Sequence, residues 1–303
     1  MDFFEVLGKM AVILCTMAAG YGANRLGYLG GETDQKLSKL LLNITMPALI
    51  LSSVLNGENR ATLSEILSLL WVSVIFYGIA FAFALLVPCL MRGSRDEKGA
   101  WRFALAFANV AFIGYPVAVA LFGPSSLFYA AILVLPCNLL SYTLGPLMLA
   151  GAKRFRWQQL LSPCVVAAVI SLLCVLADLR PPAMIGGILD FLGSVTVPFS
   201  LLVIGSLLAS LPARQMLTSP KIWLLSAVRL LVMPAVLYFV LRPMGLQPMI
   251  LGIAVTQMAM PVAINGTLMS MEYGGDTEAL AQVTFLTTVA SIVTIPLIAA
   301  LFL

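Results

Sequence analysis

The sequence predicts an all-α polytopic membrane protein, with ten transmembrane helices in two inverted five-helix repeats and with broken, crossing helices four and nine. Three observations lead to this fold class. The 303 residues are 61% hydrophobic and only 10% charged, whereas about 25% of a soluble domain is charged. Apolar stretches that approach or exceed about 18 residues, enough to span a bilayer, follow one another along the chain. Two of these stretches carry helix-breaking residues at matching positions.

Ten stretches are predicted to span the membrane. They cover residues 4–24, 36–55, 63–91, 101–122, 126–149, 160–177, 184–210, 221–241, 248–271 and 277 to the C-terminus. The first five spans form one repeat over residues 1–152, and the last five form a second repeat over residues 153–303. Because each half holds an odd number of spans, the second half enters the membrane with the opposite orientation, and the repeat is inverted.

The two halves also match in sequence. NITMPALILSSVL in span two corresponds to SVTVPFSLLVIGSLL in span seven, which aligns Pro47 with Pro198. The offset between these prolines is close to the offset between Pro116 and Pro261, and such agreement at two sites is unlikely to arise by chance. Asn43, Pro47 and Pro198 are therefore predicted to mark kinks in spans two and seven.

Spans four and nine are predicted to be broken at membrane depth. Span four contains NVAFIGYP at residues 109–116, and span nine contains TQMAMPVAINGT around Pro261. Proline removes a backbone donor and clashes with the preceding turn. In lipid, each freed backbone group needs a partner within the protein or in water. Paired broken helices in corresponding halves of a chain indicate a transporter's binding site.

Each break exposes the N–H groups at the start of a second half-helix, and these groups together with the helix dipole favour an anion. Because proline is favoured at a first helical position, Pro116 and Pro261 are predicted to begin the second half-helices. Inverted symmetry would bring both starts into one space that suits a carboxylate. The predicted substrate-binding residues are Asn109, Gly114, Tyr115, Pro116, Asn138, Gln257, Pro261 and Asn265. The alternative is that the amides only satisfy freed backbone groups or bond across helices, and that Tyr115 only packs.

Two charged residues lie inside predicted spans. Arg229 is near the middle of span eight, and Asp190 is about two turns into span seven. Charges at such depth are costly and indicate function by default. The two residues are expected either to pair or to serve in coupling, with Asp190 carrying a proton or binding a cation. In the alternative interpretation, Asp190 lies at the outer interface and Arg229 braces backbone carbonyl groups.

Composition excludes several classes of function. The chain has no histidine and its five cysteines stand singly in apolar runs, which excludes His-ligated metals and His-based catalysis. No paired acidic motif, nucleophile elbow or P-loop pattern occurs, so we expect no enzyme activity, no metal site and no cofactor. The net charge of +4 is typical of basic cytoplasmic loops and requires no nucleic acid.

Lysine and arginine predict the orientation in the membrane. Most of the 17 basic residues fall in the loops that follow spans one, three, five and seven. Because cytoplasmic loops carry the excess of basic residues, these loops are expected in the cytoplasm. Both termini are then predicted on the extracytoplasmic side of the cell membrane (the inner or plasma membrane).

At these motifs the chain resembles the bacterial branch of the auxin efflux carrier family of membrane transporters. ANVAFIGYPVAVALFG is similar to the family's fourth-span signature, with Ala108, Val110 and Ala111 in place of its common Ser, Thr and Gly. LVLPCNLLSYTLG resembles the fifth span. MPVAINGTLMSMEYGGDTEALAQVTFLTTVASIVTIPL resembles the C-terminal signature, and the likeness covers nearly the whole sequence.

The resemblance implies a scaffold of spans one, two, six and seven and a transport domain of the other six, which would move like an elevator. It also implies a homodimer formed through the scaffold. The expected function is secondary active or facilitative transport of a small organic anion, such as malate, malonate or an auxin-like acid. The alternatives are a sodium-coupled symporter of organic anions and a membrane ligand sensor that transports nothing. Coupling to a proton or to sodium stays open at this point.

Overall fold

The computed structural model describes residues 3–55, 63–150, 163–177, 179, 182–210, 219–264, 266–267, 269–270 and 274–302. All regular structure among these residues is helical, apart from one isolated antiparallel bridge between Ala108 and Val262. The prediction of an all-helical chain is therefore confirmed for the described residues. The helices fall into two groups by their contacts.

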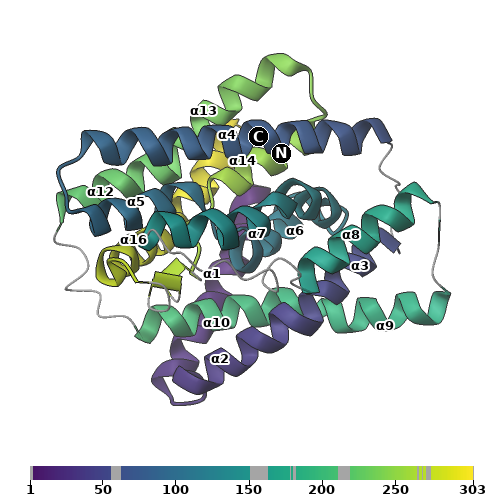
Figure 1. Cartoon of the computed structure of the whole chain (residues 1–303). Helices are drawn as coiled ribbons and strands as arrows, with labels where there is room; N and C mark the ends of the chain where they lie inside the picture. Colours follow the sequence, from purple (N-terminus) through teal and green to yellow (C-terminus); the bar gives the residue numbers. More distant parts are fainter. Residues whose placement is uncertain are drawn as a thin grey trace.

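The first group contains the predicted spans one, two, six and seven. It consists of α1 (Phe3–Arg25), α2 (Gly31–Leu40), α3 (Met46–Leu55), α8 (Pro163–Leu176), α9 (Ala183–Ser194) and α10 (Thr196–Ser210). α1 packs along α10, and α3 packs against both α8 and α9. In Figure 1, α2, α10 and α9 lie along the lower edge of the view.

The second group contains the other predicted spans. It consists of α4 (Leu63–Leu90), α5 (Arg95–Ala106), α6 (Tyr115–Phe122), α7 (Ser126–Ala150), α12 (Pro220–Ala227), α13 (Met233–Leu241), α14 (Pro248–Met258) and α16 (Thr277–Phe302). α5 packs against α4, α7 and α16, and α14 packs against α13, α7 and α4. α4, α12 and α13 lie in the upper part of the view (Figure 1). A short 3-10 turn, η5 (Arg242–Met244), follows α13.

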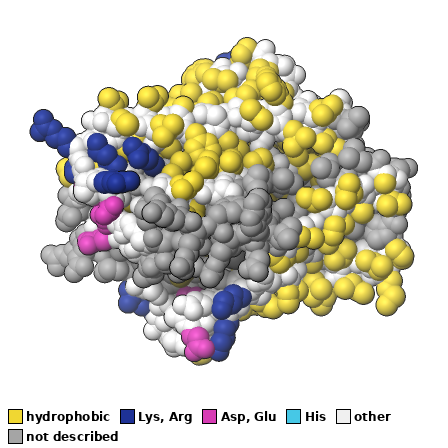
Figure 2. Space-filling view, in the orientation of Figure 1, with side chains coloured by type: hydrophobic (Ala, Val, Ile, Leu, Met, Phe, Trp, Pro, Cys, Tyr) yellow, Lys and Arg dark blue, Asp and Glu magenta, His cyan; other side chains and the backbone are white. Residues whose placement is uncertain are grey.

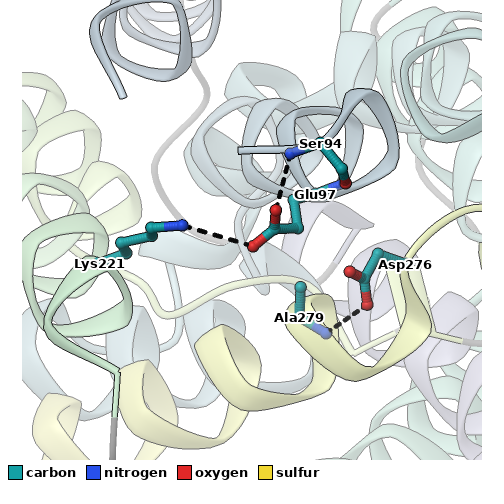
Figure 3. A network of polar contacts seen from close by, with 5 residues as sticks. All are labelled: Ser94, Glu97, Lys221, Asp276 and Ala279. Carbon is teal, nitrogen blue, oxygen red and sulfur yellow. Dashed lines mark hydrogen bonds and ion pairs between the residues drawn. The ribbon is translucent and has the colours of Figure 1, made fainter. Parts of the chain in front are cut away.

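The predicted spans overlap these helices, although several bounds differ. Two of the differences have local causes. Span four begins earlier than predicted, because Ser94 and Glu97 form a capping box at the start of α5. The Ser94 N–H donates to Glu97 Oε2 at 2.7 Å, and the Glu97 N–H donates to Ser94 Oγ at 3.0 Å (Figure 3). Such reciprocal bonds satisfy donors that a helix start leaves unpaired. Span seven is divided between α9 and α10 at Val195, just before Pro198.

π-helical turns accommodate three prolines inside the helices. Each turn ends two residues before a proline: η1 (Leu41–Thr45) before Pro47, η2 (Val110–Gly114) before Pro116, and η4 (Val228–Val232) before Pro234. Proline cannot donate a helical hydrogen bond and clashes with the carbonyl of the fourth residue before it. A single wider turn relieves this clash without ending the helix.

Four helical stretches are long and apolar enough to cross a membrane, by length and composition. They cover Ser64–Leu90, Ala183–Leu207, Pro220–Met244 and Thr277–Phe302. Figure 2 shows apolar side chains over the upper and right-hand faces, while lysine and arginine side chains lie mainly at the left-hand end and, beside acidic ones, at the lower edge. A surface of this kind, apolar over wide areas and charged in limited regions, is that of a protein embedded in lipid.

The first group is held together by very close packing of α1 against α10. A methyl group on Gly20 would lie 2.1 Å from the carbonyl oxygen of Leu202. One on Gly205 would lie 1.9 Å from the carbonyl oxygen of Met17. Only glycine permits the two backbones to approach this closely, as is common where membrane helices associate.

A polar network joins the same two helices to α2. The Asn24 Nδ2 group donates to Ser206 Oγ at 2.9 Å, and the Ser206 hydroxyl donates to Asp34 Oδ2 at 2.6 Å. The N–H of Gly30 donates to Asp34 Oδ1 at 3.0 Å. Asp34 is buried, and both of its carboxylate oxygens accept hydrogen bonds, which offsets the cost of removing the group from water.

Candidate functional site at the helix crossing

Predicted spans four and nine are interrupted, and the two interruptions lie side by side. α5 ends at Ala106 and η2 begins at Val110, whereas α14 ends at Met258 and the next described helical residue is Gly266. The N–H of Asn109 donates to the carbonyl of Pro261 at 2.7 Å, and the N–H of Ala263 donates to the carbonyl of Phe107 at 3.1 Å. These two bonds form the short antiparallel bridge. The broken segments of spans four and nine therefore meet, as the sequence predicts.

The prolines do not begin the second half-helices, contrary to our expectation. In span four the second half-helix begins at Val110, and Pro116 is the second residue of α6, inside a continuous helix. The π turn η2 accommodates this proline within the helix. In this turn the Gly114 N–H donates to the carbonyl of Asn109 at 3.0 Å. In span nine, Pro261 lies within the extended segment and provides the carbonyl that Asn109 bonds. The residue that directly precedes the half-helix in span four is therefore Asn109.

A threonine of α16 bonds a backbone N–H group in the interruption of span nine. The N–H of Val262 donates to Thr287 Oγ1 at 3.2 Å. The Thr287 hydroxyl itself donates to the carbonyls of Val283 and Thr284 in its own helix. Sequence reasoning missed this residue, although a threonine within an apolar span was an available signal. A buried partner is required here because no water is present in the bilayer core to bond a free N–H group.

Arg229 connects the first halves of both broken helices. Its side chain is 1% exposed. Its Nη1 donates to the carbonyl of Leu105 at 2.9 Å, and its Nε donates to the carbonyl of Met260 at 3.2 Å. Leu105 is in the last turn of α5, and Met260 lies two residues beyond Met258, the last residue of α14. A helix C-terminus is the negative end of the helix dipole, so one cation stabilises two such ends.

Asp190 lies elsewhere and does not pair with Arg229. It is an exposed residue of α9, and no ion pair joins it to Arg229 among the residues that the structure describes. Of our alternatives for Arg229, pairing with Asp190 is wrong, and bracing of backbone carbonyls is the arrangement observed. No described group of three or more His, Cys, Asp or Glu residues could hold a metal ion.

Gln257 reaches across the crossing from α14 to η2. Its side chain is fully buried, and a methyl group on Gly114 would lie 2.2 Å from its Oε1 atom. Neither Nε2 nor Oε1 has a hydrogen-bond partner within the described part of the chain. A buried amide without partners costs free energy unless another group bonds it. Gln257 therefore offers a donor and an acceptor at the point where the two broken helices touch.

The structure brings together six of the predicted substrate-binding residues. Asn109, Gly114, Tyr115, Pro116, Gln257 and Pro261 are all buried and lie in the crossing segments or in the helices directly beside them. Asn265 and the side chain of Asn138 lie outside the described residues.

The predicted kink residues belong to the first group of helices. Asn43 is exposed, and its Nδ2 donates to the Lys39 carbonyl of its own helix at 2.7 Å. Pro47 lies near the start of α3, and Pro198 lies near the start of α10. Each follows an irregularity in its helix, η1 in one case and the interruption at Val195 in the other.

The chain is similar to known membrane transport proteins over its full extent. The family model described as "Membrane transport protein" matches residues 5–156 and 146–299. An uncharacterized transporter of Methanothermobacter thermautotrophicus is 26% identical over 298 residues, covering 94% of each chain. Another, of Methanocaldococcus jannaschii, is 24% identical and covers 94% of this chain and 95% of the relative. A "Putative malonate transporter" of Rhizobium meliloti is 22% identical and covers 96% of this chain and 94% of the relative.

Long apolar helices and two broken segments that meet inside the protein define a multi-pass membrane protein with the architecture of a transporter. The match to the family model extends over both halves of the chain. The chain belongs to the membrane transport protein family, the auxin efflux carrier-like family of transporters that its motifs resemble.

Proposed function

We propose that this chain transports a small organic anion, a mono- or dicarboxylate such as malonate, malate or an auxin-like acid, by alternating access. The observation that carries the proposal is the positively charged, buried crossing of two broken helices. Arg229 places a cation there, and no described acidic side chain forms an ion pair with it. In a medium of low dielectric constant, such a charge attracts an anion strongly.

Neutral groups at the crossing add to this preference for an anion. The half-helix that begins at Val110 directs its first N–H groups back toward Asn109. A helix start of this kind stabilises an anion by about 0.3–1 kcal/mol, or up to about 2 kcal/mol when partly buried. The Gln257 amide adds a buried donor that no described residue occupies. A carboxylate fits this combination because it accepts several hydrogen bonds and carries one negative charge.

The name of one relative supports a dicarboxylate among the candidate substrates. The Rhizobium meliloti protein is named for malonate, and it aligns with nearly the whole of this chain. Malonate is small enough to lie beside a short half-helix and carries two carboxylates. Malate and a larger monocarboxylate are the informative comparisons, because they differ from malonate in size and charge.

The two groups of helices suit an elevator mechanism, with the first group as the fixed scaffold and the second as the transport domain. α10 contacts η2 and α6, and α1 contacts α6 and α16. The crossing therefore lies beside the boundary between the groups, where sliding would carry a bound anion across the bilayer. We include in this proposal a homodimer formed through the scaffold.

Uptake into liposomes tests the proposed function. Purified protein would be assayed for uptake of malonate, malate and indole-3-acetate, under gradients and by exchange against preloaded substrate. Gln257→Leu should reduce uptake by about tenfold or more, because a hydrogen bond to a charged group is lost. Gln282→Leu is the matched control, since that exposed amide bonds only Glu278 among the described partners.

Absence of uptake for every carboxylate, under gradients and in exchange, would reject the proposal. Binding of a carboxylate without any flux would instead identify a membrane ligand sensor. Equal loss of uptake in Gln257→Leu and Gln282→Leu would show that Gln257 has no specific role in substrate binding. Thermal unfolding of each variant, measured in parallel, separates loss of binding from loss of fold.

A further inference from the structure

The carbonyl groups at the ends of α5 and α14 form a cation site within the protein. The oxygen of Leu105 belongs to one broken helix and the oxygen of Met260 to the other. The Leu105 oxygen is in the last turn of α5, and the Met260 oxygen lies two residues beyond the end of α14, so both are near the negative ends of helix dipoles. In carriers with broken helices, carbonyls and half-helix C-termini of this kind coordinate the coupling sodium ion or proton. The ligand type therefore predicts a cation between these two oxygens.

In this chain the cation is a side chain. Arg229 donates from Nη1 and Nε to the two oxygens, at 2.9 Å and 3.2 Å, and it is almost completely buried. A guanidinium group is permanently charged, planar and weakly hydrated, which suits it to a dry site with two fixed acceptors. Arg229 comes from the π turn η4, and its other described contact is Met233 Sδ at 3.8 Å.

We propose that Arg229 is a resident cation that takes the place of a coupling ion at the crossing, so that neither sodium nor another cation binds there. A second cation would meet the positive guanidinium at close range in a medium of low dielectric constant. The two oxygens already accept hydrogen bonds from Arg229. Arg229 is a positioning residue, because it holds the first halves of both broken helices while the substrate binds beside their second halves.

This inference deepens the proposed function. It rests on the proposed function only in the experiment that measures carboxylate uptake. The primary measurement needs no substrate. Purified full-length protein would be unfolded thermally in sodium chloride and in choline chloride at equal ionic strength. The wild-type protein should give the same Tm in both salts, whereas a protein with a sodium site is stabilised by the bound ion.

Substitutions separate the charge of Arg229 from its packing. Arg229→Met should lower the Tm by about 5–10 °C, because the removal of one partner from a buried charged contact is strongly destabilising. Arg229→Lys keeps the positive charge, and its Tm should fall clearly less than that of Arg229→Met. Arg242→Met is the matched control, since Arg242 is exposed on η5 and stacks only on Tyr238 among the described rings. This control should keep the wild-type Tm.

Chemical rescue tests whether a cation is what the site requires. Methylguanidinium chloride should raise the Tm of Arg229→Ala toward the wild-type value, and sodium chloride should raise it above its value in choline chloride. Tetramethylurea, which is neutral and of similar bulk, should not. If Arg229→Ala does not fold, the comparison of Arg229→Lys with Arg229→Met decides the question alone.

A Tm of the wild-type protein that rises in sodium relative to choline would overturn the inference. So would equal stability of Arg229→Lys and Arg229→Met, which would leave Arg229 with a packing role alone. Carboxylate uptake that depends on sodium would keep the proposed function and reject this inference. Absence of uptake would reject the proposed function and leave the cation measurements valid.

Discussion

At the scale of single residues, the crossing depends on groups that reach it from distant parts of the chain. Arg229 from η4 and Thr287 from α16 bond backbone that the breaks leave outside regular helix, and Gln257 from α14 lies against Gly114 of η2. Each of these side chains bonds or lies close to a polar backbone group whose burial without a partner would cost free energy. Among them, Gln257 keeps both amide atoms and Arg229 keeps Nη2 without a hydrogen-bond partner in the described structure, so both side chains can bond a substrate.

Gly114 provides the space that the Gln257 amide occupies. Gly114→Ala would place a methyl group 2.2 Å from Gln257 Oε1, so the amide must move away from the crossing. We expect loss of substrate affinity together with a destabilisation of about 1–3 kcal/mol from overpacking. Isothermal titration and thermal unfolding measure the two effects.

A double-mutant cycle tests whether Gly114 acts through Gln257. In a Gln257→Ala background, Gly114→Ala should have little further effect on affinity, because the clashing amide is already absent. Gly78→Ala is the control, since a methyl group there meets nothing within 4 Å. If the losses of affinity in the cycle are additive, the contact between Gly114 and Gln257 is not the cause of the lower affinity of Gly114→Ala.

At the scale of elements, prolines modify the helices without dividing the molecule. Pro116 was expected to begin a half-helix, but the π turn η2 places it inside one. The real interruption in span four needs no proline, because the segment around Ala108 is held in extended form by its bonds to the segment around Val262. Tertiary hydrogen bonds between the two breaks therefore define where each helix stops.

The contact between α1 and α10 predicts a second effect of glycine substitution. Gly205→Ala would place a methyl group 1.9 Å from the carbonyl oxygen of Met17, and a backbone atom cannot move aside as a side chain can. We expect α1 and α10 to separate slightly, with a loss of stability of about 1–3 kcal/mol or more. The measurement is thermal unfolding of the purified protein in detergent.

Gly22→Ala is the control for this contact, because Gly22 lies in α1, the partner helix of α10, and a methyl group there meets nothing within 4 Å. Its Tm should stay at the wild-type value or rise slightly, since alanine favours helix more than glycine does. A Tm for Gly205→Ala equal to that of Gly22→Ala would show that the two helices tolerate a wider separation.

At the scale of the whole molecule, most visible basic side chains lie at the left-hand end and at the lower edge, and apolar side chains cover the upper and right-hand faces (Figure 2). At the left-hand end, Lys221 of α12 forms an ion pair with Glu97 of α5 at 3.7 Å (Figure 3). The Lys221 Nζ atom also lies 5.3 Å from the ring centroid of Trp101. The start of α16 is close by, where the N–H of Ala279 donates to Asp276 Oδ1 at 2.9 Å. The starts of three helices thus share one end of the molecule.

The distribution of basic residues predicts the topology, with this end in the cytoplasm and both termini outside. Single cysteines placed near residue 95 or at the C-terminus, in a variant that lacks the five native cysteines, would be treated with a membrane-impermeant maleimide on intact cells. The terminal cysteine should react, and the one near residue 95 should react only after the membrane is permeabilised. The reverse pattern would show the opposite orientation.

The sequence by itself determined the apolar spans, most of their ends and the presence of a break in spans four and nine. These features are local, because they depend on composition, capping residues such as Ser94 and helix-breaking residues within each segment. Only the tertiary structure decided that Arg229 bonds both broken helices, that Gln257 lies against Gly114 and that Asp190 lies apart. Those contacts join residues far apart in the chain, and their geometry follows from how the helices pack rather than from any pattern within one helix.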